Sequence, residues 1–246
     1  MRLTRVYVDA ALEPGTRVTL AGSAASHITR VLRLRPGAAL TLFNGRGGEY
    51  AGNIEHSDAG KVTVALSTQH AVERESPLAL TLAQGVSRGE RMDLVVQKAT
   101  ELGVSCIAPL LTERSVVRLD PLQSARKVAH WRGIAIAACE QSGRNRVPEV
   151  ATPLALREFT GIATAVGAAG ARLLLSPAAA LRLDDVAPPV TEVTVLIGPE
   201  GGLTDSEQEL ARTAGFTPVR LGPRVLRTET AAIAALALLQ RNFGDL

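Results

Sequence analysis

The chain has 246 residues, 46% of them hydrophobic and 21% charged, which is enough for one or two domains with full hydrophobic cores. It contains two cysteines without the spacing of a zinc site or a disulfide framework, no apolar signal segment at its N-terminus, and no apolar run near the about 18 residues of a membrane-spanning helix. This composition argues against a membrane protein and a disulfide scaffold. It predicts a cytoplasmic protein without a metal site.

Basic residues are concentrated in two parts of the chain, although the net charge is only +3. Residues 26–46 include several arginines and no acid, and residues 114–146 are also rich in arginine. Such clusters are typical of a surface that meets a polyanion, most simply RNA. Aromatic residues make up only 3% of the chain, which argues against a base-stacking sheet. Any single arginine is equally compatible with an ordinary solvated position.

The first part of the chain predicts a small β-barrel with one helix. Short alternating runs separated by turn residues predict strands at residues 5–8, 17–20, 39–43, 50–54 and 61–66. A helix is predicted over residues 24–34, ending before Pro36. His27, Arg30 and Arg33 recur at every third position of this helix and would share one face. The candidate RNA-binding residues are His27, Arg30, Arg33, Arg35 and Arg46, with Arg114 further along the chain.

The pattern changes to alternating strands and helices near residue 74, so we expect one domain at residues 1–73 and a second at residues 74–246. Strands are predicted at residues 78–86, 104–111, 172–175, 193–197 and 217–221. Helices are predicted at residues 91–102, 120–141 and 231–239. This alternation predicts an α/β domain with a mainly parallel sheet and helices on both faces.

Two glycine-containing loops near the C-terminus each follow a predicted strand and lead into a helix. The first is residues 198–202, after which Thr204 and Glu207 form a capping-box pattern, and the second is residues 222–227. Parallel sheets bind ligands at the carboxyl ends of their strands, so the two loops could close on one small molecule. The first loop does not have the pattern of a P-loop or of a dinucleotide fingerprint. The first loop alone is also compatible with an ordinary strand–turn–helix joint.

The two loops and their surroundings resemble the SPOUT class of RNA methyltransferases. The matching sequences are Ile-Gly-Pro-Glu-Gly-Gly-Leu-Thr at residues 197–204 and Leu-Gly-Pro-Arg-Val-Leu-Arg-Thr-Glu-Thr-Ala at residues 221–231. Further segments match the branch that methylates N3 of a uridine in 16S ribosomal RNA: residues 27–33, 97–104, 112–115 and 140–144. Several dispersed motifs in one order are more specific than any single glycine loop. Val225 is a mild departure, because this branch usually has isoleucine there.

The resemblance implies a fold that the residue patterns alone do not give. It implies a PUA-like β-barrel that binds RNA, followed by a SPOUT domain whose chain forms a deep trefoil knot, a feature nearly absent from other folds. It also implies a homodimer that acts on 16S rRNA in the small ribosomal subunit.

The same resemblance implies S-adenosylmethionine as the cofactor. An adenine ring needs an apolar slot and close backbone approach, which the residue types in the two loops provide. The residues expected to line this pocket are Leu175, Ser176, Ile197, Gly198, Pro199, Glu200, Gly201, Leu221, Gly222, Val225, Leu226, Thr230 and Ala231.

Methylation at N3 requires loss of the N3 proton and stabilisation of the resulting charge. A guanidinium group near the ring oxygens would stabilise that charge, and Arg144 is the first candidate, followed by Arg227 and Arg114. Glu140 and Glu229 are candidates for accepting the proton or for orienting an arginine. Each arginine is also compatible with a phosphate contact or a structural ion pair.

Two other functions stay open. The same fold could methylate a ribose 2′-hydroxyl or another base, although the order of motifs argues against this. The chain could also be a non-catalytic RNA-binding factor in ribosome assembly, although such a factor has no need of intact cofactor loops. Cys139 is interpreted as a packed helix residue, and Trp131 as a residue packed in the core or at an interface.

Overall fold

The computed structural model describes residues 4–115, 117, 119–166, 170–186 and 191–246. The chain divides into two compact units, one of Met1–Glu75 with Ile136–Val147 and one of Ser76–Ala135 with Pro148–Leu246. The first unit therefore includes a segment from later in the chain, which a boundary between residues 73 and 74 does not anticipate. The boundary itself stays a prediction.

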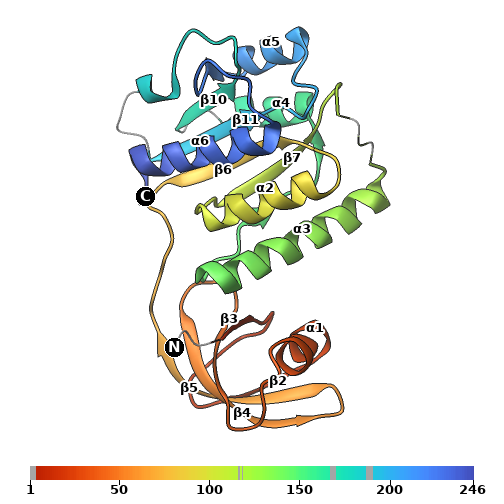
Figure 1. Ribbon diagram of the computed structural model, residues 1–246, viewed down its shortest axis with the longest axis vertical. Coiled ribbons are helices and arrows are strands. Elements are labelled where there is room, and N and C mark those ends of the chain that lie inside the picture. The colour runs from red at the N-terminus through yellow and green to blue at the C-terminus, as the bar shows by residue number, and fades with distance from the viewer. Residues whose placement is uncertain (1–3, 116, 118, 167–169, 187–190) are drawn as a thin grey trace. The chain divides into compact units, whose positions relative to one another are not determined.

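The first unit contains a five-stranded sheet in the order β1-β3-β4-β5-β2 (Figure 1). Its strands, all predicted from the sequence, are β1 (Arg5–Tyr7), β2 (Arg17–Leu20), β3 (Ala39–Phe43), β4 (Glu49–Asp58) and β5 (Lys61–His70). β1 pairs with β3 in parallel, and the other neighbours are antiparallel. Alternate side chains of β4 and β5 are buried along much of each strand, as expected for a sheet with one face on a core.

The helix of this unit is shorter than predicted. It comprises α1 (Gly22–Ser26) and a π-helical turn, η1 (His27–Val31). Arg33 lies beyond the helix with a φ of 52°, in the left-handed region. The prediction that Arg33 shares a helical face with His27 and Arg30 is therefore wrong, because spacing by three places residues together only while the helix continues. Arg30, Arg33, Arg35 and Arg46 are exposed, and His27 is half-buried.

The second unit is built on a parallel sheet in the order β12-β10-β11-β6-β7-β8, with β9 also pairing with β7. The strands are β6 (Ala79–Gly85), β7 (Cys106–Leu111), β8 (Glu149–Val150), β9 (Leu154–Ala155), β10 (Ala171–Leu175), β11 (Glu192–Ile197) and β12 (Thr217–Val219). Every recorded pairing in this sheet is parallel, which confirms the predicted α/β architecture. β8 and β9 were not predicted, because two residues are too few for a periodic signal.

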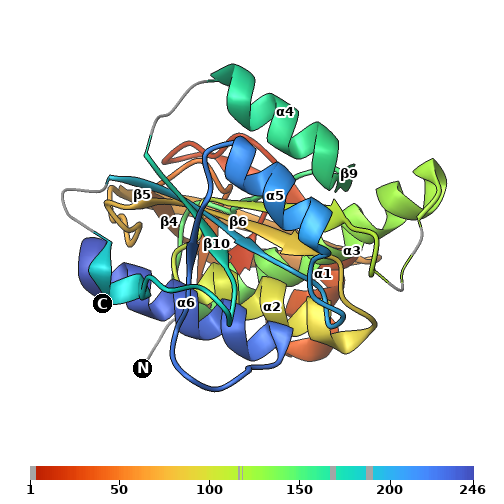
Figure 2. The same cartoon turned by 90° about the horizontal axis from the view of Figure 1, so that it is seen from above.

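Helices cover both faces of this sheet (Figure 2). α2 (Glu90–Glu101) and α6 (Thr228–Phe243) pack together on one face, and α4 (Leu156–Val166) and α5 (Asp205–Thr213) lie on the other. α4 was not predicted from the sequence. A core on its side of the sheet is formed by Ala83, Ala108, Leu110, Leu156, Leu174, Leu196, Leu203, Ala211, Ala214 and Phe216.

The longest helix, α3 (Pro121–Ser142), contributes residues to both units. In the second unit, His130 Nε2 of α3 is 2.9 Å from Asp93 Oδ2 of α2, and Trp131 is only 1% exposed. Trp131 is thus a packed residue, as interpreted from the sequence. A short 3₁₀ helix, η2 (Leu183–Asp185), follows β10.

None of the helices within the described ranges has the length and apolar character needed to cross a membrane. The trefoil knot implied by the resemblance stays a prediction.

Candidate functional site

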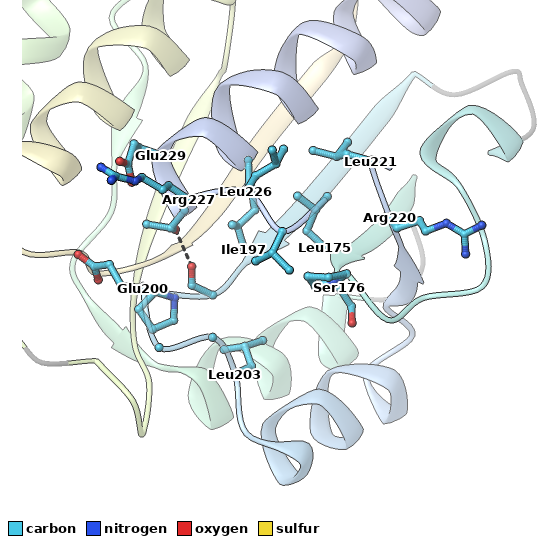
Figure 3. A pocket seen from close by; sticks show the side chains of 18 of the residues that line it. Leu175, Ser176, Ile197, Glu200, Leu203, Arg220, Leu221, Leu226, Arg227 and Glu229 are labelled. Carbon is cyan, nitrogen blue, oxygen red and sulfur yellow. Dashed lines mark hydrogen bonds between the residues drawn. The ribbon is translucent and has the colours of Figure 1, made fainter. Parts of the chain in front are cut away.

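A cavity of about 690 Å³ opens in the second unit at the carboxyl ends of β10, β11 and β12 (Figure 3). Its walls come from residues 175–177, from the first glycine loop, from the second glycine loop and from the start of α6. In Figure 3 the side chains of Leu175, Ile197 and Leu226 gather at the centre of the site, with Glu200 and Arg220 toward its edges. This is the edge at which parallel sheets bind ligands.

The residues expected around the cofactor come together at this cavity. With one exception, all of them are among its lining residues. The exception is Thr230, which is exposed, because on α6 the neighbouring Ala231 is the residue that turns inward. That these residues hold a cofactor stays a prediction at this point.

Local hydrogen bonds fix the first loop and the helix that follows it. Thr204 accepts from Glu207 N at 3.3 Å through Oγ1, and Thr204 N donates to Glu207 Oε2 at 2.9 Å, which confirms the predicted capping box. The other oxygen, Glu207 Oε1, accepts from Glu113 N at 2.8 Å. Gly202 has a φ of 68°, a left-handed conformation that favours glycine, and its N–H closes the turn on Pro199 O at 2.9 Å.

Buried hydrogen bonds join the end of β6 to the first glycine loop and to Thr228, which follows the second loop. Gln84, at the end of β6, is fully buried, and its Nε2 donates to Thr228 Oγ1 at 3.0 Å and lies 3.4 Å from Gly198 O. Thr228 Oγ1 donates to the same Gly198 O at 2.7 Å. The sequence analysis missed both Gln84 and Thr228. The available signal was a glutamine inside an otherwise apolar buried strand, since buried polar groups require hydrogen-bond partners.

Gly85 brings the first loop against β6. A Cβ atom at this position would lie 2.5 Å from Pro199 N, so only glycine allows this approach. Gly198 is similarly close to the loop backbone, with Gly202 C at 3.1 Å from its ideal Cβ. The cavity wall therefore depends on backbone packing that any added side chain would disturb.

The carboxylate of Glu200 is held at the edge of the cavity. Its Oε1 accepts from Arg88 N at 3.1 Å and from Arg91 Nη1 at 2.9 Å. Burial acts to raise the pKa of Glu200, but hydrogen bonds from backbone N–H groups and from Arg91 hold that pKa below its usual value. Glu200 thus caps the backbone N–H of Arg88 and pairs with Arg91.

Two of the candidate catalytic residues, Arg227 and Glu229, line the cavity. Glu229 Oε2 is buried and has no hydrogen-bond partner among the residues that the structure describes. A buried acceptor without a partner calls for an explanation, and a bound ligand group would be one. Arg114 lies next to the first loop, where its Nη1 donates to Gly201 O at 3.2 Å.

Arg144 and Glu140 belong to the first unit and have partners there. Arg144 is 5% exposed, and its Nε and Nη2 donate to Glu75 Oε2 at 3.0 and 2.5 Å. Glu140 Oε1 accepts from Tyr7 N at 2.9 Å. These bonds fasten the end of α3 and the following segment to the five-stranded sheet. A catalytic role for either residue stays a prediction.

The same segment is held by a second buried arginine that the sequence analysis did not single out. Arg5 is 8% exposed, forms an ion pair with Glu49, and donates to Arg144 O at 3.0 Å and to Asn145 Oδ1 at 2.6 Å. Its guanidinium carbon also lies 4.8 Å from the centroid of the Phe43 ring. No local pattern marks such a residue, because its partners are far away in sequence.

The cysteines and the other acids do not form a reactive or metal-binding group in the described ranges. Burial raises the pKa of the Cys139 thiol to about 12, so it stays protonated, in agreement with its interpretation as a packed residue. No cluster of three or more histidine, cysteine or acidic residues suited to a metal ion occurs in the part of the chain that the structure describes.

Comparison with known proteins identifies the class that this fold and cavity define. A family model described as an RNA methyltransferase domain matches residues 74–240, and one described as an RNA methyltransferase PUA domain matches residues 20–67. The chain belongs to this family of RNA methyltransferases.

Individual relatives agree over the full length. The ribosomal RNA small subunit methyltransferase E of Buchnera aphidicola subsp. Schizaphis graminum is 33% identical over 245 residues, covering 100% of this chain and 98% of that protein. A protein of Legionella pneumophila described as a methyltransferase, solved with bound S-adenosylmethionine, is 44% identical with a TM-score of 0.93. The ribosomal RNA small subunit methyltransferase E of Neisseria gonorrhoeae, also bound to S-adenosylmethionine, is 38% identical with a TM-score of 0.91. Both structural matches cover 100% of each chain.

Proposed function

We propose that this protein uses S-adenosylmethionine to methylate N3 of a specific uridine in the 16S rRNA of the small ribosomal subunit. The observation that carries the proposal is the cavity between the two glycine loops, in a chain that belongs to an RNA methyltransferase family. Full-length relatives named as small-subunit rRNA methyltransferases support the substrate class. The atom and the nucleotide rest on the resemblance of the dispersed motifs.

The residues around the cavity fit S-adenosylmethionine. Leu175, Ile197 and Leu226 offer an apolar slot for the adenine ring, and the glycines of the two loops present backbone groups at close range. The volume of about 690 Å³ falls within the usual range of about 300–1,000 Å³ for small-molecule sites. When bound, the cofactor supplies a methyl group that is already activated by its sulfonium, so no metal is required.

Within this site, Glu229 accepts the N3 proton and Arg227 stabilises the charge on the uracil ring. Glu229 is the better placed of the two candidate acids, because its Oε2 has no partner in the part of the chain that the structure describes, while Glu140 accepts a backbone N–H in the first unit. Arg227 lines the same cavity and is exposed at the start of α6. The Glu229 carboxylate would take the N3–H proton, Arg227 would stabilise the negative charge left on the ring, and the bound cofactor would supply the methyl group that N3 gains in place of the proton.

The remaining parts of the proposal concern the assembly. The protein acts in the cytoplasm as a homodimer, and its PUA-like domain at residues 1–73 binds rRNA through His27, Arg30, Arg33, Arg35 and Arg46. The domain at residues 74–246 contains the trefoil knot. A family match over residues 20–67 supports the RNA-binding role of the first domain.

The test is transfer of labelled methyl from S-adenosylmethionine to small ribosomal subunits from a strain that lacks this protein, followed by nucleoside analysis. The proposal predicts 3-methyluridine confined to 16S rRNA. Another methylated nucleoside would contradict the choice of atom but keep the cofactor. If the protein neither transfers the methyl group nor binds the cofactor, the result would indicate an RNA-binding assembly factor instead.

A Gly201→Arg variant separates these outcomes further. The ideal Cβ of Gly201 lies 3.0 Å from Arg114 Cβ, so a large side chain at this position disturbs the cavity wall. Loss of methyl transfer with RNA binding retained is expected. Equal loss of RNA binding would contradict a role of this loop limited to the cofactor.

A further inference from the structure

The side chains that line the cavity carry more positive than negative charge, and the cofactor does not explain this excess. Four arginines and two glutamates are among the lining residues. S-adenosylmethionine is itself cationic, because its sulfonium and ammonium groups outweigh its single carboxylate. Like charges repel, so arginines in excess of the glutamates do not favour the cofactor as a whole, although one of them can pair with its carboxylate. The excess positive charge is complementary to a further, anionic, ligand.

Three of the four arginines are accounted for. Arg91 pairs with Glu200 at 2.9 Å, and Arg220 donates to Ala179 O at 2.6 Å through Nη1. Arg227 lines the cavity close in sequence to the open carboxylate of Glu229, and the proposed function assigns both to the reaction. Arg224 is the arginine that is left over.

Arg224 lies at the tip of the second glycine loop. Its side chain has no hydrogen bond or ion pair with any residue in the described ranges, and Pro223, Arg224 and Val225 are all exposed. Val225 is 80% exposed, the largest exposed fraction recorded for a large hydrophobic side chain in the described part of the chain. The neighbouring Leu226 is half-buried in the cavity wall. The loop thus turns one apolar and one cationic side chain outward at the mouth of the cavity.

We propose that this loop tip, Pro223–Val225, is a contact surface for the RNA strand that carries the acceptor uridine. Arg224 binds a backbone phosphate beside that nucleotide, and Val225 packs against the exposed face of a neighbouring base or sugar. Phosphate contacts fix the register of a strand on a protein, and apolar contact with unstacked bases tolerates many sequences. This inference rests on the proposed function and places part of the RNA-binding surface on the methyltransferase unit itself. An unpaired arginine favours a polyanion over a second copy of the chain as the occupant.

The experiment measures RNA and cofactor separately for Arg224→Gln and Val225→Ser. The RNA probe is the small ribosomal subunit from a strain lacking this protein, bound at several salt concentrations, and cofactor affinity is measured by calorimetry. Arg224→Gln should raise KM for subunits several-fold and lower the slope of log K against log salt by about 0.7–0.9, the value for one phosphate contact. Val225→Ser should raise KM with little change in that slope. Arg224→Gln should keep the cofactor Kd and the kcat at saturating subunits. Because Val225 lines the cofactor cavity, the KM of Val225→Ser for subunits is compared with that of the wild type at a saturating cofactor concentration set from its own measured Kd.

Two surface variants of the same unit serve as controls. Arg241→Gln removes an exposed arginine near the other end of α6, about 20 Å from Arg227 at 1.5 Å per residue. Ile162→Ser removes an apolar side chain that is 55% exposed on α4 and does not line the cavity. Both controls should match the wild type in KM and in salt slope.

The possible outcomes distinguish this surface from the proposed function. Unchanged KM and slope in both tip variants, with wild-type transfer intact, would overturn the RNA-contact surface alone. Dissociation of a dimer by Val225→Ser, seen by sedimentation, would overturn it in favour of a second copy as the occupant. A wild type that binds subunits with an Arg224-dependent slope but transfers no methyl would support the surface while overturning the proposed function.

Discussion

The candidate catalytic arginines and glutamates have different surroundings in the two units. In the first unit, Arg144 and Glu140 are bonded to Glu75 and to Tyr7 N. In the second unit, Glu229 has a buried oxygen without a partner among the described residues, and Arg227 is exposed at the edge of a cavity. A charged group whose bonds are satisfied by its own fold stabilises that fold, whereas a group with an open bond is available to a ligand. The comparison therefore favours Glu229 and Arg227 over Glu140 and Arg144 as candidates for the chemistry.

The largest effect should come from breaking the buried ion pair of the first unit. Arg144→Leu leaves Glu75 without its guanidinium partner and should lower the free energy of unfolding by about 3–5 kcal/mol. Chemical denaturation monitored by circular dichroism measures this. The control Arg146→Gln removes a surface pair with Glu73 at 3.4 Å, for which about 0–1 kcal/mol is expected. Full stability together with loss of methyl transfer in Arg144→Leu would instead assign Arg144 to catalysis.

Glu229→Gln should lower the rate of methyl transfer and leave the stability of the fold unchanged. Loss of a positioned proton acceptor lowers kcat by about 10²- to 10⁴-fold, with unfolding free energy near that of the wild type. Single-turnover methyl transfer at several pH values gives the rate, and Glu209→Gln, an exposed acid paired with Arg212 on α5, is the matched control. A kcat within a few-fold of the wild type would rule out Glu229 as the proton acceptor.

Gln84→Leu tests how the second unit holds its two loops. The variant loses the hydrogen bond to Thr228, so we expect destabilisation of about 1–3 kcal/mol together with weaker binding of S-adenosylmethionine. Thr160→Val is the control, because it removes a buried hydroxyl that donates to Leu156 O within α4, away from the cavity. Equal losses of stability with equal cofactor affinity in the two variants would show that Gln84 does not position the loops.

The smallest expected effect is a decline of cofactor affinity at acid pH that depends on Glu200. The pKa of Glu200 is lower in the folded state than its usual value of 4.5. The ionised carboxylate therefore stabilises the fold fully at pH values above 4.5, and this stabilisation is lost as the pH falls through the lower pKa of the folded state. Cofactor affinity of the wild type should therefore decline at acid pH more than that of Glu200→Gln. Calorimetric titrations between neutral pH and about pH 4 measure the difference. Parallel pH profiles for the two proteins would contradict a role of this carboxylate in shaping the cavity.

Much of the fold could be predicted, but its long-range bonds could not. Apart from the two-residue strands β8 and β9, the strands of both units and the Thr204 capping box follow from patterns within a few residues of each other. α4 was missed because its sequence, with threonine and glycine inside an apolar run, gives a weak helical signal. Arg5, Gln84 and Thr228 were missed because each finds its partner across at least 30 residues.

The sequence by itself determined the strand–helix alternation and the two loops, which depend on side-chain periodicity, glycine and capping chemistry, all of them local. Its resemblance to a known family implied the set of residues expected around the cavity. Only the tertiary structure decided which charged side chains are buried in ion pairs and which are exposed. Arg144, Arg224 and Arg227 are alike in sequence, and the difference between a buried ion pair, an exposed loop tip and a cavity wall arises from chain segments that meet only after folding.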